Sequence, residues 1–522
     1  MTGRSSPGLA CALIAFEGTR VEGPIAHQVG DPRVAGVTLY GSINIESAEQ
    51  TRSMTADLQR AANRPILIAV DQEGGQLTAA GPETTHFAGN MAIGAAGDED
   101  LAFRVGAATG LELAALGINL NYAPVADIAS RPYNPSLGIR SFGEDPAAVS
   151  RLTAAMVKGL QSSGVAATLK HFPGKGEAQV DPHLELPVLD LDLERLNRVE
   201  FAPFRAGIEA GARFVMIGHY GLPAITGDRR LPTSASSAVM QGVVRDQLGF
   251  EGVIVTDALD MGAFEGVALE EPLSAGCDLL LYGPAQAGTL PIAPRSSMLI
   301  GGGPSALPPR LESVLAWLAG FPQPEPSVIG SSEHAALAAV LAARSITLVR
   351  DDQRRLPFKL SSDCKVLAVM PQPTDLTPAD TSSMVTPGLG AALRHRHPAT
   401  DEITVGYSPT DAEISAVVAA AESHDVVVVG TIDANDAQKH LVRLLVGGGA
   451  GNERTLITVS LRTPYDLAGY PEAATHLAAY GIHPPTMTAL VDALFGLTPI
   501  SGHLPVAIPG LYPVGHGLMR TS

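Results

Sequence analysis

Lysine, cysteine and tryptophan are all scarce in this chain of 522 residues. It contains six Lys, three Cys and one Trp, and its formal net charge is −18. The excess of negative charge argues against nucleic acid or an anionic membrane surface as the main partner. The cysteines, Cys11, Cys277 and Cys364, are odd in number, far apart and placed in apolar runs. This pattern is typical of buried thiols in a reducing compartment, so we expect a cytoplasmic protein without a disulfide framework.

The sequence also has no apolar run as long as a membrane span. "GLACALIAF" (residues 8–16) follows Arg4 and resembles the core of a signal peptide. It has no small-x-small cleavage site followed by polar sequence, and it is equally compatible with a first buried strand, so export stays the alternative. The length predicts two to four domains, and 45% hydrophobic residues are enough to build large cores.

Short apolar runs alternate with helix-length segments from residue 10 to about residue 284. Several of these runs are apolar almost throughout, as strands buried on both faces must be. The eight runs cover residues 10–16, 34–41, 65–72, 118–128, 164–172, 212–220, 251–258 and 277–284. Amphipathic segments such as 146–164 lie between them and predict helices. Eight strands, each followed by a helix, predict an α/β fold of the (β/α)8 TIM-like barrel type, with an open doubly wound sheet as the alternative.

A second, smaller α/β sandwich domain is predicted after the barrel. "FPQPEPSVIGSSE" (321–333) has the composition of a linker, and five further apolar runs alternate with helical segments beyond it. We therefore expect a catalytic barrel over 1–320, a linker over 321–333 and a C-terminal domain over 334–522. "VGGGAGN" (446–452) lacks the full glycine fingerprint of a phosphate-binding loop and predicts a flexible loop.

Ionisable residues gather at the predicted carboxyl ends of the barrel strands, where catalytic groups lie in this fold. Lys170 and His171 open the stretch "KHFPGKGEAQVDPHLELP" (170–187) at the end of the fifth run, Asp71 ends the third and Asp257 ends the seventh. The same end of the barrel is predicted to hold Glu73, Arg140, Asp181, His183 and His219. These residues predict a polar site of saccharide size.

Glycosyl transfer is one chemistry that fits these residue types. It needs a carboxylate to attack the anomeric carbon and a second group to protonate the departing oxygen. Asp257, in "GVIVTDALDMGA", is placed to be the nucleophile, although an Asp at this point can also cap the next helix. Asp181 and His183 can form an acid/base unit in which the carboxylate orients the imidazole. A loop carboxylate beside a surface histidine is the alternative.

Metal-assisted hydrolysis is a competing chemistry. Asp181, His183, His171, His219 and Asp257 are all residue types that bind zinc or iron. The sequence contains no HExxH motif. We therefore expect a site without metal.

Five stretches, in order along the chain, resemble glycoside hydrolase family 3. They are "VDQEGG" (70–75), "IRSFGEDP" (139–146), "KHFPG" (170–174), "DPH" (181–183) and "LGFEGVIVTDALDMGA" (248–263). "KHFPG" followed by Asp-x-His is similar to the bacterial β-N-acetylglucosaminidase branch. "RTPYDLAGYPEAATHLAAYG" and "GHLPVAIPG" resemble the C-terminal domain of two-domain members.

The resemblance implies retaining hydrolysis of N-acetylglucosaminides, including muropeptide fragments from cell-wall recycling. It implies that Asp257 is the nucleophile, that His183 is the acid/base and that Asp181 tunes it. It further implies that four residues hold hydroxyls of the sugar: Asp71, Arg140, Lys170 and His171. Family members act on small saccharides without a metal or an organic cofactor, and we expect a monomer or a homodimer.

Three departures from the family pattern lie around the site. Gln76 and Ala79 stand where the family has Arg, Lys175 begins the segment that usually reads His-Gly-Asp-Thr, and Pro182 replaces Ser. Because the nucleophile and the Asp–His pair remain, hydrolysis is the leading hypothesis. A phosphorylase or transglycosylase is the second, because Lys175 adds positive charge nearby. A sugar-binding or regulatory homologue with weakened catalysis is the third.

Overall fold

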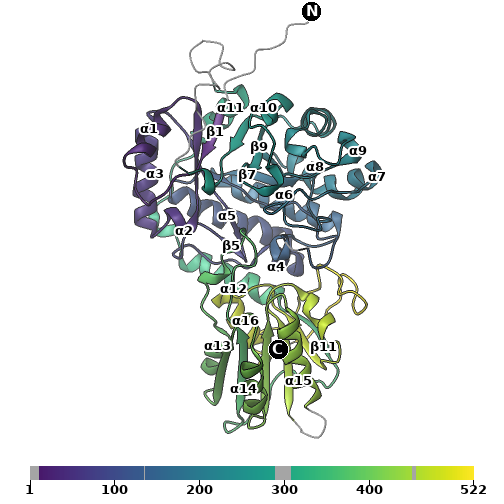
Figure 1. The fold of residues 1–522 in the computed structure, drawn as a ribbon. Coiled ribbons are helices and arrows are strands. Elements are labelled where there is room, and N and C mark those ends of the chain that lie inside the picture. The colour runs from purple at the N-terminus through teal and green to yellow at the C-terminus, as the bar shows by residue number, and fades with distance from the viewer. Residues whose placement is uncertain (1–10, 135, 288–306, 449–453, 522) are drawn as a thin grey trace, which may run out of the picture.

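A closed barrel of parallel strands and a separate six-stranded sheet organise the protein (Figure 1). The structure is a computed structural model that describes residues 11–134, 136–287, 307–448 and 454–521. The barrel order is β1-β10-β9-β8-β7-β6-β3-β2. Its strands are β1 (Cys11–Ile14), β2 (Val34–Leu39), β3 (Leu67–Val70), β6 (Leu120–Asn121), β7 (Ala166–Phe172), β8 (Phe214–Ile217), β9 (Val253–Ala258) and β10 (Leu279–Leu281). Each predicted run contains one of these strands, which confirms the barrel.

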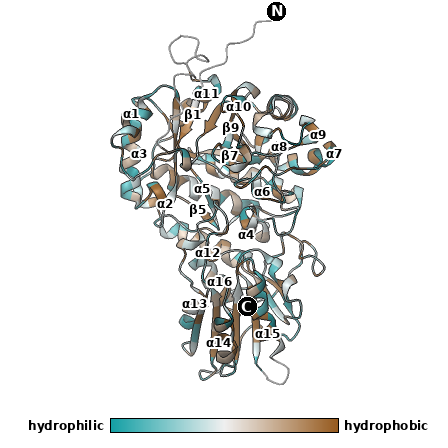
Figure 2. Cartoon of the chain, viewed as in Figure 1, coloured by the Kyte–Doolittle hydropathy of each residue, from teal (hydrophilic) through white to brown (hydrophobic). Residues whose placement is uncertain are grey.

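Helices surround the barrel and turn their apolar residues inward. The α-helices are α1 (Pro24–Gly30), α2 (Gly41–Asn44), α3 (Ala48–Ala62), α4 (Asn90–Ala96), α5 (Glu99–Ala115), α6 (Pro146–Ser162), α7 (Leu193–Arg195), α8 (Phe201–Glu209), α9 (Pro223–Thr226), α10 (Glu271–Ala275) and α11 (Pro309–Leu318). Residues 196–200 and 238–247 are π-helical, and β4 (Gln72–Gly74) and β5 (Leu77–Thr78) form a small hairpin at the barrel mouth. Figure 2 shows the apolar colour concentrated on the strands and on the helix faces that pack on them.

The fourth barrel strand, β6, is much shorter than the apolar run that predicts it. Pro124 follows it and has no N–H to donate to a neighbouring strand. The chain nevertheless stays beside β7, because the Ala126 N–H donates to the Lys170 carbonyl at 2.7 Å. This path carries Asp127 to the mouth of the barrel.

The C-terminal sheet has the order β11-β16-β15-β14-β12-β13. Its strands are β11 (Thr347–Asp351), β12 (Val366–Pro371), β13 (Thr400–Val405), β14 (Val426–Thr431), β15 (Thr455–Ser460) and β16 (Thr475–Ala478). Its helices are α12 (Ser332–Ser345), α13 (Leu389–Arg396), α14 (Asp411–Ala421), α15 (Asp436–Gly447) and α16 (Pro484–Leu494). All strand pairs are parallel except β11 with β16. The chain places β13 on one side of β12 and β14 on the other, so the strand order reverses between β12 and β14.

Direct hydrogen bonds join the C-terminal sheet to the barrel mouth. Thr381 donates its N–H to the Gln76 carbonyl at 2.8 Å, and the His483 Nε2 lies 2.8 Å from the Gly75 carbonyl. Residues from the second half of the chain therefore fix the position of the turn after β3.

Two sequence predictions concern a loop near residue 450 and the absence of a membrane span. Helix α15 extends to Gly447, and residues 449–453 lie outside the described residues, so the loop predicted over 446–452 stays a prediction. Within the described ranges, no helix combines the length and the apolar character that crossing a membrane requires.

Candidate active site

A cavity of about 450 Å³ opens at the carboxyl ends of the barrel strands. That volume lies in the range of small-molecule sites. Six of the seven predicted site residues line it: Asp71, Arg140, Lys170, His171, His183 and Asp257. The seventh, Asp181, binds the ring of His183. The C-terminal half of the chain contributes residues 378–381 to the same cavity, a contribution that the sequence did not reveal.

The base of the cavity is a network of buried, mutually paired charges. Arg140 donates from Nε and Nη2 to the two carboxylate oxygens of Glu73, each at 2.8 Å. The Lys170 ammonium lies 2.5 Å from Glu73 Oε1 and 2.5 Å from Asp71 Oδ1. Burial would raise the pKa of Glu73, but the Arg140 and Lys170 charges outweigh it and hold that pKa well below its usual value. Glu73, which sequence reasoning placed at this strand end without a role, therefore fixes both cations.

Asp127 orients the histidine of the predicted sugar grip and was missed by sequence reasoning. Its Oδ1 accepts the backbone N–H groups of His171 and Lys175, and its Oδ2 accepts from His171 Nδ1 at 2.8 Å. Burial, together with the Lys175 and Arg140 charges, lowers the pKa of His171 well below its usual value. The ring is therefore neutral, and its Nε2 accepts from Arg140 Nη2 at 3.4 Å. The available signal was a carboxylate at the end of an apolar run.

Asp181 and His183 form a tight side-chain pair beside the cavity. The carboxylate Oδ1 accepts from His183 Nδ1 at 2.6 Å and from the His183 backbone N–H at 3.0 Å. Burial would raise the pKa of Asp181, but these hydrogen bonds outweigh it and lower that pKa. The Gly262 N–H donates to the His183 carbonyl at 3.1 Å, which ties this loop to the segment after β9. The pairing uses Nδ1 of His183, and no described residue forms a hydrogen bond with its Nε2.

Asp257 ends β9 and lines the cavity with its side chain. Its Oδ1 accepts the Ala258 N–H at 2.8 Å. Burial alone would raise the pKa of Asp257, but the imidazoles of His171, His219 and His183 outweigh burial and lower it. The carboxylate is therefore ionised at neutral pH, as a nucleophile must be.

His219 holds the end of β9 in place and does not line the cavity. Its Nδ1 lies 2.6 Å from the Ser234 hydroxyl, and its Nε2 lies 3.0 Å from the Ala258 carbonyl. Both ring nitrogens are thus used within the protein.

Lys175 is a buried residue that lines the cavity. Its side chain is buried, and among the described residues nothing forms an ion pair or a hydrogen bond with its Nζ. Burial and the Arg140 charge lower the pKa of Lys175 to about 8, although Asp127 and Asp257 oppose this change. The cavity therefore contains a cation whose hydrogen bonds are unused.

The remaining departures from the family pattern also have definite positions. Ala79 lines the cavity with a small side chain, whereas Gln76 is buried and its Oε1 accepts the Ile139 N–H at 3.2 Å. Glu177 pairs with Arg195 at 2.8 Å and does not line the cavity. Across the described part of the chain, no three His, Cys, Asp or Glu side chains are grouped to hold a metal ion.

A (β/α)8 barrel with a carboxylate and a carboxylate–imidazole pair at one cavity has the groups that a barrel glycoside hydrolase needs. Residues 12–293 match the glycosyl hydrolase family 3 N terminal domain, which is more than half of the chain. The chain belongs to this family.

Relatives of known name match most of the chain. The beta-hexosaminidase A of Pseudoalteromonas piscicida is 29% identical over 91% of this chain and 89% of its own length. A beta-hexosaminidase of Stenotrophomonas maltophilia is 36% identical over 52% of this chain and 82% of its own length. The solved structure of a family 3 β-N-acetylglucosaminidase from Paenibacillus sp. superposes with a TM-score of 0.84 at 32% identity, covering 96% of this chain and 98% of that chain.

Proposed function

We propose that the protein is a retaining β-N-acetylhexosaminidase that hydrolyses N-acetylglucosaminides. The observation that carries this proposal is the position of Asp257 and of the Asp181–His183 pair around one cavity. The names of the relatives support N-acetylglucosamine as the sugar that is transferred. We expect muropeptide-derived saccharides in the cytoplasm to be the substrates. We further propose a barrel domain over 1–320, a linker over 321–333 and a C-terminal domain over 334–522.

The proposed reaction proceeds in two displacements. Asp257 attacks the anomeric carbon and forms a covalent glycosyl ester while the glycosidic bond breaks. His183 gives its Nε2 proton to the departing oxygen, and Asp181 stabilises the imidazolium and holds the ring. Water then attacks the ester, and His183 takes the proton from that water. Two inversions at one carbon return the original configuration.

The buried charge network is the proposed grip on the transferred sugar. Asp71 supplies acceptor oxygens for hydroxyls, while Arg140 and Lys170 supply donors whose positions Glu73 fixes. The Asp127 carboxylate holds the ring of His171 in one orientation. Because these groups are already paired, they lose little freedom when the sugar binds.

Phosphorolysis or transglycosylation is a second candidate, favoured by one observation. Lys175 places a buried cation in the cavity, and no described residue acts as its acceptor. An ammonium in such surroundings attracts an oxyanion strongly, so inorganic phosphate can take the place of water in the second displacement. A homologue with weakened catalysis is the remaining alternative.

Turnover of a panel of aryl β-glycosides, with and without inorganic phosphate, tests the proposal. We expect the N-acetylglucosaminide to react faster than the glucoside and the N-acetylgalactosaminide, and to release free sugar. Phosphate-dependent release of a sugar 1-phosphate would establish the second candidate. A purified, folded protein that turns over no glycoside would leave only the sugar-binding homologue.

A further inference from the structure

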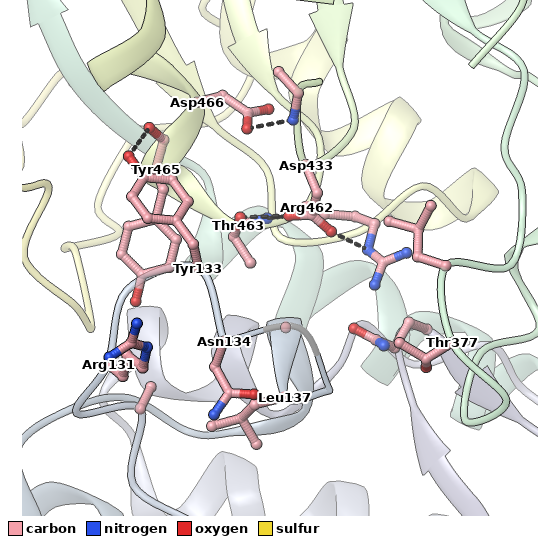
Figure 3. Close-up of a pocket in the computed structure, with 15 residues that line it drawn as sticks. Arg131, Tyr133, Asn134, Leu137, Thr377, Asp433, Arg462, Thr463, Tyr465 and Asp466 are labelled. Carbon is pink, nitrogen blue, oxygen red and sulfur yellow. Dashed lines mark hydrogen bonds and ion pairs between the residues drawn. The ribbon is translucent and has the colours of Figure 1, made fainter. Parts of the chain in front are cut away.

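A second cavity, of about 210 Å³, lies between the barrel and the C-terminal sheet (Figure 3). It shares no lining residue with the catalytic cavity. The barrel contributes Gln76, Ala129 and the segment after β6, including Arg131, Tyr133 and Asn134. Residues after three strands of the C-terminal sheet form the opposite wall. None of the chemistry proposed above uses this cavity.

The cavity lies where the topology of the C-terminal sheet predicts a ligand. Thr377 follows β12, Asp433 follows β14, and Arg462 follows β15. The strand order reverses between β12 and β14. In open parallel sheets, ligands bind in the crevice at the carboxyl ends of the strands where this reversal occurs.

The lining of this cavity contains two cations, Arg131 and Arg462, and two carboxyl groups, Asp433 and Asp466. Arg462 is clamped between Asp380, at 2.7 Å, and Asp433, at 3.0 Å. Asp466 accepts the Ala434 N–H at 2.7 Å, and burial raises the pKa of Asp466 to about 7. The balance favours a neutral ligand over an ionised one.

Hydrogen-bonding and aromatic groups remain available to such a ligand. The Thr377 hydroxyl is buried and has no hydrogen-bond partner within the described residues. The rings of Tyr133 and Tyr465 lie side by side, with centroids 5.1 Å apart, and Tyr133 is 57% exposed. Figure 3 shows this pair at the side of the cavity where the two halves of the chain meet. Aromatic faces beside an unpaired hydroxyl group suit a sugar ring, which has apolar C–H faces and a polar rim.

One ion pair separates the two cavities. Asp380 lines the catalytic cavity, and its carboxylate binds Arg462, which lines the second one. The chain also passes directly from Thr377 in the second cavity to Pro378 in the first. The linings of the two cavities are therefore adjacent on the side of the catalytic cavity that the C-terminal half of the chain forms.

We propose that the cavity at the switch point of the C-terminal sheet is a binding subsite for a neutral sugar ring in the leaving group of the substrate. The proposal rests on the proposed glycosidase function and assigns the C-terminal sheet a role in substrate selection. Its volume limits the subsite to a single small unit, since pockets for larger ligands exceed about 300 Å³.

The test compares kcat/KM for two substrates in each variant. One is an aryl β-N-acetylglucosaminide, whose leaving group ends at the phenol, and the other is a neutral N-acetylglucosamine tetramer. Tyr133→Ala removes the aromatic face, Thr377→Trp fills the cavity, and Phe103→Ala removes an exposed ring from α5 as the matched control. We expect both cavity variants to lower the tetramer-to-aryl ratio of kcat/KM about tenfold, mainly through KM for the tetramer. The control should keep the wild-type ratio.

The outcomes distinguish failure of the proposed subsite from failure of the proposed glycosidase function. An unchanged ratio in both cavity variants, with normal turnover of the aryl glycoside, overturns the subsite and leaves the proposed function standing. If the wild type turns over neither substrate, the proposed function fails, and calorimetric titration with the tetramer then decides the subsite. Equal affinity of wild type and Tyr133→Ala in that titration overturns it, and weaker binding by Tyr133→Ala supports it.

Discussion

The barrel and the C-terminal sheet both gather charged side chains at the carboxyl ends of parallel strands, but they use them differently. At the barrel mouth, Asp257 and Lys175 present ionisable groups to the cavity with no ion-pair partner of their own among the described residues. At the carboxyl ends of the strands of the C-terminal sheet, Arg462 is buried between Asp380 and Asp433. The charges at the barrel mouth are therefore available for reaction. The charges at the C-terminal sheet instead fix the position of Arg462 and the segments that contain Asp380 and Asp433. Mutations should therefore affect chemistry in one region and stability in the other.

The largest effect should come from the barrel. Asp257→Ala removes the proposed nucleophile, so we expect kcat on an aryl N-acetylglucosaminide to fall at least about a thousandfold, or ~4 kcal/mol of barrier. Far-UV circular dichroism should show an unchanged fold. Asp190→Ala, which removes an exposed carboxylate paired with Arg229, is the matched control and should keep the wild-type rate. Near-normal rates in Asp257→Ala would mean that another group attacks the sugar.

His183→Ala should produce a loss that depends on the leaving group. Good leaving groups depart with little protonation, so aryl glycosides with acidic phenols should keep much of their rate. Disaccharides should lose about a hundredfold to ten-thousandfold. Asp181→Ala should show the same pattern less severely, because the imidazole remains but is oriented less well.

The measurement for this pair is the rate as a function of leaving-group pKa in wild type and variants. Glu177→Gln serves as the control, because Glu177 pairs with Arg195 outside the cavity. A His183→Ala slope equal to that of wild type would remove His183 from the role of acid.

At the C-terminal sheet, the expected effect is on stability. Arg462→Met leaves the buried Asp380 and the partly buried Asp433 without their cation, so we expect the free energy of unfolding to fall by about 3 kcal/mol. Arg60→Met breaks an exposed pair with Asp57 and should cost less than about 1 kcal/mol. Urea unfolding followed by circular dichroism compares the two. Equal midpoints would show that the Arg462 clamp does not support the fold.

The last expected effect concerns the pH dependence of stability. Burial raises the pKa of Asp466 from 3.8 to about 7 in the folded protein, so the folded state binds a proton that the unfolded state has already released between these values. The stabilisation from this group is therefore present below pH 3.8 and lost as the pH rises toward 7. Asp466→Asn removes this dependence, and its stability relative to wild type should increase from pH 4 to pH 7. Parallel stability curves over that range would contradict the assignment.

The barrel could be predicted from the sequence because its strands are buried on both faces. Runs such as 251–258 are apolar for that reason, and several of them, including 65–72, 164–172 and 251–258, carry polar residues of the mouth at their carboxyl ends. Strand β13 was not predicted. It lies at the edge of its sheet, and the middle of "TDEITV" is partly exposed, so it has no continuous apolar pattern.

The sequence predicted the candidate site less completely than it predicted the fold. The seven predicted residues come together because strand ends of a barrel converge on one point. Asp127 was missed because a single carboxylate after a short strand has no distinctive spacing. Residues 378–381 were missed because their approach to the cavity depends on long-range contacts, such as the hydrogen bond from Thr381 to Gln76.

The central claim is that Asp257 forms a covalent bond with the sugar. An activated fluoro-sugar analogue of N-acetylglucosamine, which forms the glycosyl ester quickly and loses it slowly, tests this claim directly by mass spectrometry of the digested protein. We expect one added sugar, located on the peptide that contains Asp257 and absent in Asp257→Ala. A sugar attached to another residue, or hydrolysis of the analogue with no covalent species, would contradict it.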